Sequence, residues 1–94
     1  MRTIERSSAF KRDYRRVKAT PRHRQDVDGL LLAVLALLAD DQPLPKSLRD
    51  HALSGAWSSY RECHLKPDLL LIYRKADADM LRLARLGSHS ELFD

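Results

Sequence analysis

The segment Leu69-Leu70-Leu71-Ile72-Tyr73 constrains the fold more than any other part of the sequence, because five large and mainly apolar residues follow one another. Side chains of a strand point alternately to its two faces, so a strand made of such a run must be covered on both faces. A chain of 94 residues has room for one core, and we expect one domain spanning residues 1–94. The run therefore predicts a central strand, with helices on one face and other residues on the reverse.

Short runs separated by turn residues lie on either side of this segment. The expected strands are residues 60–65, 69–74 and 80–86, with Pro67 and Asp68 in the first turn. Successive strands with such short connections predict an antiparallel meander. Residues 2–6 alternate weakly in polarity, which indicates one more short strand near the N-terminus.

The first half of the chain has the periodicity of helices. Ser7 or Ser8 can cap a helix by accepting a hydrogen bond from a free N–H of its first turn. Phe10, Tyr14 and Val17 then share one face, at positions i, i+4 and i+7. This spacing predicts an amphipathic helix directly after the N-terminal strand.

A second helix is expected to open at Pro21, because the fixed φ angle of proline suits a first helical turn after Thr20. It should end at Asp40, since Pro43 and Pro45 cannot continue a helix. The predicted buried stripe consists of Val27, Leu30, Leu31, Val34, Leu35 and Leu38. Together these elements predict an α+β fold in the order β-α-α-β-β-β, with two helices packed on one face of an antiparallel sheet.

Positive charge is concentrated at the start of the chain. Nine of the 17 Lys and Arg residues lie among the first 24 residues, which contain only two acidic residues. Such a cluster favours a polyanionic partner, because cations that neutralise phosphates release condensed counterions; a merely solvated helix face is the alternative. The candidate polyanion-binding residues on the first helix are Lys11, Arg12, Arg15, Arg16 and Lys18.

The remaining composition indicates a cytoplasmic protein without a membrane segment. Cys63 is the single cysteine, so the chain cannot form an internal disulfide. The N-terminus lacks the apolar region of a secretory signal. The longest apolar run, residues 30–39, is about half the length that a membrane-spanning helix needs.

Histidines and carboxylates gather in the strand-rich half. Alternation places Glu62 and His64 on one face of the expected strand, Asp68 follows in the next turn, and His51 and His89 lie in the flanking connections. RNA cleavage by the 2′-hydroxyl needs a base, an acid and positive charge near the phosphate, and histidine can take or give a proton near neutral pH. The spacings match no standard zinc motif, and this chemistry requires no metal or cofactor. Separate surface or capping histidines are the alternative.

The order of these residues resembles the YafQ branch of the RelE toxin superfamily over nearly the whole chain. The matching segments are Leu44-Pro45, Asp50-His51-Ala52-Leu53-Ser54-Gly55, Trp57, Tyr60-Arg61-Glu62-Cys63-His64, Pro67-Asp68, Leu71-Ile72-Tyr73, Leu81-Arg82 and Gly87-Ser88-His89-Ser90-Glu91-Leu92-Phe93. The resemblance implies a RelE-like fold and a toxin of a type II toxin-antitoxin system. It also implies an endoribonuclease that cuts messenger RNA on the ribosome after attack by the 2′-hydroxyl.

By this resemblance His51, His64, Asp68 and His89 occupy the catalytic positions, and Phe93 lies near the substrate. We expect His89 to be the general acid. His51 and His64 should supply the base and phosphate contacts, and Asp68 should orient an imidazole.

Two further residues are assigned to the substrate. Glu62 stands where aspartate is frequent in the family. Alternation along the last strand predicts that Arg82 and Arg85 point to opposite faces, so only one can face the phosphate, and we expect Arg82 to be that residue.

The resemblance also implies partners. These are the ribosome with its messenger RNA, and a cognate ribbon-helix-helix antitoxin. The toxin would contact operator DNA only through this antitoxin. Two rival functions stay open. One is a non-catalytic, ParE-like toxin of the same fold, and the other is a basic RNA-binding module without catalytic activity.

Overall fold

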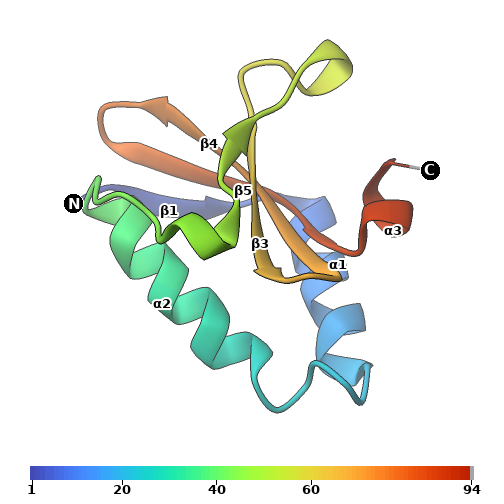
Figure 1. Ribbon diagram of the computed structural model, residues 1–94. Helices are drawn as coiled ribbons and strands as arrows, with labels where there is room; N and C mark the ends of the chain where they lie inside the picture. The colour runs from blue at the N-terminus through green and yellow to red at the C-terminus, as the bar shows by residue number, and fades with distance from the viewer. Residues whose placement is uncertain (94) are drawn as a thin grey trace.

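The computed structural model describes residues 1–93, which form two helices, a five-stranded sheet and a short C-terminal helix (Figure 1). The elements in chain order are β1 (Thr3–Arg6), α1 (Ser8–Ala19), α2 (Val27–Ala39), β2 (His51–Ala52), β3 (Arg61–Lys66), β4 (Leu69–Asp77), β5 (Met80–Gly87) and α3 (His89–Phe93). Two 3-10 turns, Lys46–Leu48 and Gly55–Trp57, flank β2. The predicted α+β class and the order of the main elements are confirmed.

The strand order is β1-β5-β4-β3-β2, which puts the apolar segment of β4 in the middle of the sheet as predicted. The strands β2 to β5 pair antiparallel, but β1 pairs parallel with β5, so the sheet is mixed. A parallel pair needs a long crossover connection, and the two helices lie within the chain that connects β1 to the rest of the sheet. The expectation of a purely antiparallel sheet was wrong for this edge strand.

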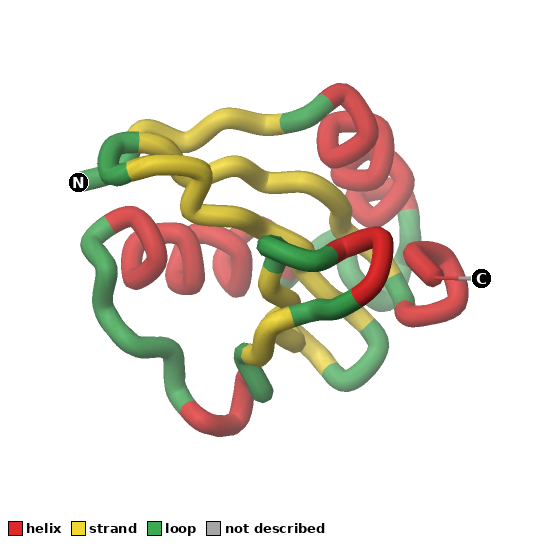
Figure 2. The backbone as a smooth tube through the Cα atoms, turned by 90° about the horizontal axis from the view of Figure 1, so that it is seen from above, coloured by secondary structure: helices red, strands yellow, loops and turns green. Residues whose placement is uncertain are grey.

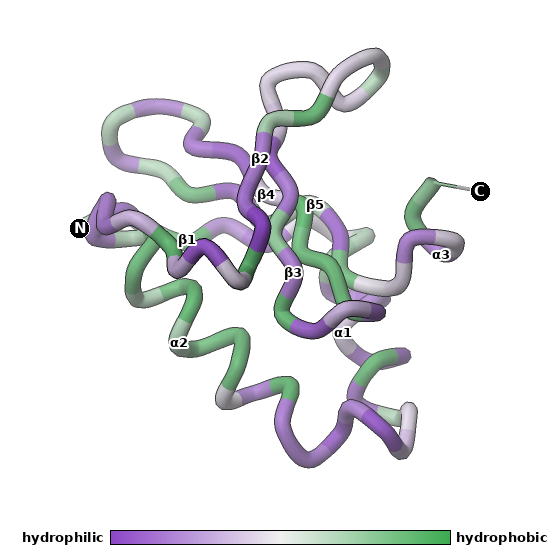
Figure 3. Tube along the Cα trace, viewed as in Figure 1, coloured by the Kyte–Doolittle hydropathy of each residue, from purple (hydrophilic) through white to green (hydrophobic). Residues whose placement is uncertain are grey.

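The two long helices cover one face of the sheet, and the segment between β2 and β3 lies over the other (Figures 1 and 2). Leu69, Leu71 and Tyr73 of β4 pack among the buried residues of α1 and α2. Leu70 and Ile72 form a second cluster on the opposite face. Hydrophobic residues are concentrated in α2 and in the central strands (Figure 3). Burial on both faces explains why this strand is apolar at every position.

The start of α2 differs from the prediction, because residues 21–26 form turns and the helix begins at Val27. Thr20 has an extended backbone, as steric conflict with a following proline favours, and this ends α1. The turn buries His23, whose Nδ1 lies 3.3 Å from Lys66 Nζ at the end of β3. A tertiary contact of this kind has no signal in local periodicity. The other end of the helix, at Ala39, agrees with the prediction.

The start of α1 is confirmed, because the Ser7 hydroxyl accepts a hydrogen bond of 2.9 Å from the N–H of Phe10. Among the described residues, no helix is long and apolar enough to cross a membrane.

Candidate active site

The face of the sheet opposite the long helices carries the candidate site. Paired residues of neighbouring strands share a face, so the register defines the rows of side chains that cross it. One row runs from His51 through Glu62 and Ile72 to Arg85, and the next runs from His64 through Leu70 to Gly87. The histidines predicted from β2 and β3 therefore stand in adjacent rows, and His89 follows two residues after the second row ends.

His51 and His64 are brought together, with 6.4 Å between their ring centroids. The ring of His51 is exposed, and its Nδ1 lies 2.7 Å from the carbonyl oxygen of Arg49. A carbonyl oxygen accepts a hydrogen bond, so the proton of a neutral His51 ring resides on Nδ1. This leaves Nε2 as a free acceptor that is able to take a proton from a substrate.

Glu62 contacts His64 and is the register partner of His51. Its carboxylate is 3.3 Å from Nε2 of His64, and only 4% of the residue is exposed. Glu62 is therefore a buried strand residue and not a solvated one. Because so little of Glu62 reaches solvent, its geometry suits orientation of the His64 ring better than contact with a substrate.

His89 is the first residue of α3 and is exposed at the end of β5. Its ring lies 4.9 Å, centroid to centroid, from the ring of Phe93, so the two predicted residues form one surface. Strands β3 and β5 are separated by β4, which puts His64 and the end of β5 about 10 Å apart. That gap is of the size that a nucleotide can occupy between the two sets of imidazoles.

Asp68 does not orient any of these imidazoles. Its carboxylate is 3.0 Å from Nη1 of Arg22 and 3.9 Å from Nε2 of His23, both in the connection between α1 and α2. The predicted contact of Asp68 with a site histidine is absent from the described residues, because the turn before α2 supplies these partners. The fold thus brings His23, from the helical half of the chain, beside a carboxylate of the strand-rich half.

The arginines of β5 differ from the prediction because of a β-bulge. Ile72 pairs with Arg85 while Tyr73 pairs with Leu83, so Ala84 is an extra residue and the alternation is shifted. Arg82 and Arg85 consequently start from the same face instead of opposite ones.

Arg82 lies five residues before Gly87, roughly 16 Å along the strand, and its Nη1 contacts Glu5 at 2.5 Å. The structure thus pairs Arg82 with β1 and not with the candidate histidines. Arg85 stands in the same row as Glu62, but its guanidinium binds Asp13 of α1 at 2.7 Å.

The basic residues of α1 fall into two classes. Lys11, Arg12 and Arg15 are exposed and make no ion pair among residues 1–93. Arg16 and Lys18 are held in contacts with acidic residues, Lys18 by Asp28 at 2.7 Å. The structure therefore leaves three of the five predicted cations free for a polyanion.

Asp50 is a contributor that the sequence reasoning missed. Its carboxylate accepts hydrogen bonds from the Tyr73 hydroxyl and, at 3.0 Å, from Nη2 of Arg61. Burial and the bond to this carboxylate raise the pKa of Tyr73, so its hydroxyl stays a donor. Asp50 precedes His51, and its anchoring fixes the backbone that carries the catalytic candidate.

Cys63 lies on the helix-facing side of β3 and is fully buried. Burial is the main cause that raises the pKa of its thiol to about 12, and the charges of Asp50 and Glu62 act in the same direction. A thiol with this pKa is protonated at neutral pH, so Cys63 fills the core and is not a nucleophile.

Two hollows lie on the surface of the molecule. The larger, of about 670 Å³, runs between β1, α1 and α2, and its lining includes none of the predicted histidines. The smaller, of about 380 Å³, lies beside His64 and is also lined by Arg49 and Lys66. The smaller hollow therefore offers space next to His64, with Arg49 as its unpaired cation among the described residues, since Lys66 contacts Asp26 at 2.8 Å.

Comparison with known proteins agrees with this geometry. Residues 2–94 match the family described as "Bacterial toxin of type II toxin-antitoxin system, YafQ". The mRNA interferase toxin YafQ of Escherichia coli K12 is 37% identical over 92 residues, which cover 98% of this chain and 96% of that protein. YafQ in the crystal structure of the E. coli DinJ-YafQ complex has a TM-score of 0.83 and 34% identity, with full coverage of both chains.

A metal-bound toxin from Helicobacter pylori is also similar, with 47% identity and a TM-score of 0.84 over 99% of this chain and all of that one. In residues 1–93 of the present structure, no group of three or more His, Cys, Asp or Glu side chains is placed to hold a metal ion.

Proposed function

The chain belongs to the YafQ family of type II toxin-antitoxin toxins, and from that premise we propose that it is an endoribonuclease that cuts messenger RNA on the ribosome. The observation that carries the proposal is the grouping of His51 and His64 on the sheet face whose far end carries His89. Its E. coli relative is named an mRNA interferase toxin. Three exposed or half-buried imidazoles on one face supply the acid and base groups that this reaction needs.

The proposed reaction starts with removal of the 2′-hydroxyl proton by Nε2 of His51, the free acceptor of a ring whose Nδ1 faces Arg49. The 2′-oxygen then attacks the adjacent phosphorus, and the bond from phosphorus to the 5′-oxygen breaks. His89 donates a proton to this leaving oxygen. The products are a 2′,3′-cyclic phosphate and a 5′-hydroxyl, and no further reactant is consumed.

His64 stands between these two groups, and in its imidazolium form it would donate to the phosphate through Nδ1, because its Nε2–H faces Glu62. Phe93, whose ring lies 4.9 Å from the ring of His89, would contact the nucleotide whose 5′-oxygen is the leaving group. Each positioned acid or base is worth roughly 10²–10⁴ in rate, so loss of His89 should reduce cleavage to near background.

The free cations of α1 support the ribosomal part of the proposal. Lys11, Arg12 and Arg15 are exposed on one helix. Contacts to phosphates give affinity without sequence preference, and this suits a protein that docks among ribosomal RNA and leaves the cut to the sheet face.

A toxin of this family implies an antitoxin, and E. coli YafQ forms a complex with DinJ. We propose a cognate ribbon-helix-helix antitoxin for this chain, with contact to operator DNA through that partner alone. An acidic antitoxin segment would complement the cations of α1. Histidines gathered on one face argue against the two rivals, a ParE-like toxin without catalysis and a plain RNA-binding module, because neither needs them.

The proposal is tested in a translating extract that contains one defined message, with cut sites mapped by primer extension. We expect cuts in the wild-type reaction, none with ribosome-free RNA, and none with His89→Ala. Arrested translation with an intact message would favour the non-catalytic rivals. Cleavage that persists in His89→Ala would place the active site elsewhere.

A further inference from the structure

The short helix that carries His89 is fixed at its start by its own side chains. The N–H of Ser88 donates to Oε1 of Glu91 at 2.8 Å, and the N–H of Glu91 donates to the Ser88 hydroxyl at 3.2 Å. This reciprocal pair is a capping box, and His89 is the first residue inside it. A helix of five residues is too short to be stable alone, so its orientation depends on the buried side chain of Leu92 and on what holds Glu91.

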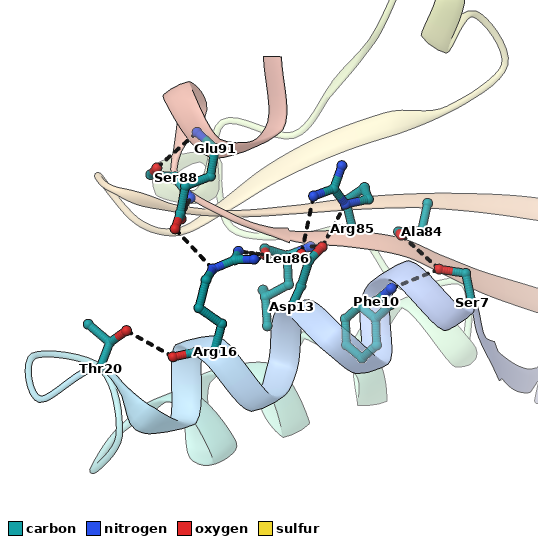
Figure 4. A network of polar contacts seen from close by, with 10 residues as sticks. All are labelled: Ser7, Phe10, Asp13, Arg16, Thr20, Ala84, Arg85, Leu86, Ser88 and Glu91. Carbon is teal, nitrogen blue, oxygen red and sulfur yellow. Dashed lines mark hydrogen bonds and ion pairs between the residues drawn. The ribbon is translucent and has the colours of Figure 1, made fainter. Parts of the chain in front are cut away.

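Arg16 of α1 holds that glutamate (Figure 4). Its Nε lies 2.9 Å from Oε2 of Glu91, the carboxylate oxygen that the capping box does not use. Its Nη1 donates to Asp13 at 2.9 Å, and its Nη2 donates to the carbonyl oxygen of Leu86 at 2.9 Å. One guanidinium therefore joins α1, the end of β5 and α3 in a fixed fork geometry.

The end of β5 is open to this contact because β1 stops short. β1 pairs with β5 only as far as Leu83, so the backbone of residues 84–86 has no strand partner on that edge. Side chains of α1 replace the missing strand. The Ser7 hydroxyl donates to the carbonyl oxygen of Ala84 at 2.8 Å, and Asp13 accepts from the N–H of Leu86 at 3.0 Å.

Gly87 leaves the space that the guanidinium occupies. A Cβ at this position would lie 2.6 Å from Nη2 of Arg16 and 3.0 Å from Oε1 of Glu91. The glycine of the segment Gly87-Ser88-His89 is thus explained by the passage of Arg16 to α3, since any side chain would displace it.

We propose that Arg16 is a positioning residue, which acts through Glu91 to set the place of His89 over the substrate. The inference rests on the proposed function, because it concerns the same reaction. It also replaces the sequence-based assignment of Arg16 to phosphate binding, since all three of its nitrogen atoms are engaged within the chain.

The kinetic test is single-turnover cleavage of a ribosome-bound message. We expect Arg16→Gln to lower the rate at saturating ribosome by about 10- to 100-fold, the loss expected when an acid is displaced by about 1 Å, with little change in the half-saturating concentration. Glu91→Gln should give a loss of the same kind. The double variant should lose no more than the larger single loss, because the two residues act as one unit.

Two further variants separate positioning from general damage. Arg16→Lys should recover part of the rate, because an ammonium can reach Glu91 but cannot serve three acceptors at once. The matched control is Arg2→Gln, which removes another ion-paired arginine, bound to Asp41 at 2.9 Å near the start of β1, and should leave the rate unchanged. Glu91 is 43% exposed at its side chain, so Glu91→Gln keeps a folded variant available if Arg16→Gln unfolds.

A different kinetic pattern is expected if Arg16 binds the phosphate of the substrate. A phosphate-binding Arg16 would raise the half-saturating concentration in Arg16→Gln without lowering the saturated rate, and Glu91→Gln would then have no effect. That pattern would overturn the inference while leaving the proposed function intact.

An activity-independent measurement covers the case in which the wild-type protein does not cleave RNA, which would refute the proposed function. In NMR spectra of the free protein, Arg16→Gln and Glu91→Gln should shift the ring signals of His89 and speed amide exchange in α3, whereas Arg2→Gln should do neither. Unchanged His89 signals in both variants would overturn the positioning role.

Discussion

At the scale of single residues, Asp13 does the most to join the helix layer to the sheet. It is 2% exposed, and its carboxylate accepts hydrogen bonds from Arg85, Arg16 and the N–H of Leu86. The sequence marks Asp13 only as an acid within a basic helix, because two of its three partners, Arg85 and Leu86, lie more than 70 positions away. Local patterns predict amphipathicity, and they do not predict which polar residue is buried.

Asp13 should make stability depend on pH. Burial acts to raise its pKa, but the hydrogen bonds from Arg85, Leu86 and Arg16 outweigh burial and leave the pKa below its ordinary value. A carboxylate whose pKa is lower in the folded state stabilises the fold above its unfolded pKa, and this contribution is lost as the pH falls through the folded pKa. Asp13→Asn should therefore cost about 3 kcal/mol at pH 7 and much less at low pH.

Urea denaturation of the wild-type protein and of Asp13→Asn, from pH 7 down to pH 2, measures the difference in their free energies of unfolding. The matched control is Asp40→Asn, since Asp40 is exposed at the end of α2 and makes no ion pair among residues 1–93. Asp40→Asn should leave the free energy of unfolding almost unchanged at every pH. A constant difference between Asp13→Asn and the wild-type protein over the whole range would contradict the account.

At the scale of elements, the predictable features were those that repeat along the chain. The alternating and helical periods gave β3, β4, β5, α1 and the end of α2 close to their observed bounds. The start of α2 and the bulge at Ala84 could not be predicted, because both depend on contacts with distant segments. The bulge has the largest effect on the site, because one extra residue puts Arg82 and Arg85 on the same face of the sheet.

The helix α1 carries two kinds of cation that its composition does not separate. Its ion-paired cations tie the fold together, and its free cations are available to phosphates. The triple variant Lys11→Gln/Arg12→Gln/Arg15→Gln should weaken ribosome binding and reduce the slope of log affinity against log salt by up to about 2 to 3. Sedimentation with ribosomes at several salt concentrations measures the slope.

The matched control for this variant is Arg2→Gln/Lys75→Gln, which removes two cations bound to Asp41 away from α1. It should leave the slope unchanged. Equal slopes for the wild-type protein and the triple variant would show that α1 does not dock on RNA.

At the scale of the whole molecule, the fold separates the free cations of α1 from the candidate histidines. The long helices cover one face of the sheet (Figure 1), and the register puts His51 and His64 on the other face, with His89 just after the end of β5. The sequence order of His51, His64 and His89 was enough to propose one site, because β2, β3, β4 and β5 follow one another as neighbours. It was not enough for Asp68 or Arg82, whose partners come from the connection before α2 and from β1.

The central claim is that these histidines promote attack by the 2′-hydroxyl. The most direct measurement uses a ribosome-bound message with a single 2′-deoxynucleotide at the mapped cut, and mass spectrometry of the fragment ends. The account predicts no cut at the deoxynucleotide, and a 2′,3′-cyclic phosphate with a 5′-hydroxyl on the unmodified message. Cleavage at the deoxynucleotide, or fragments that carry a 5′-phosphate, would contradict it.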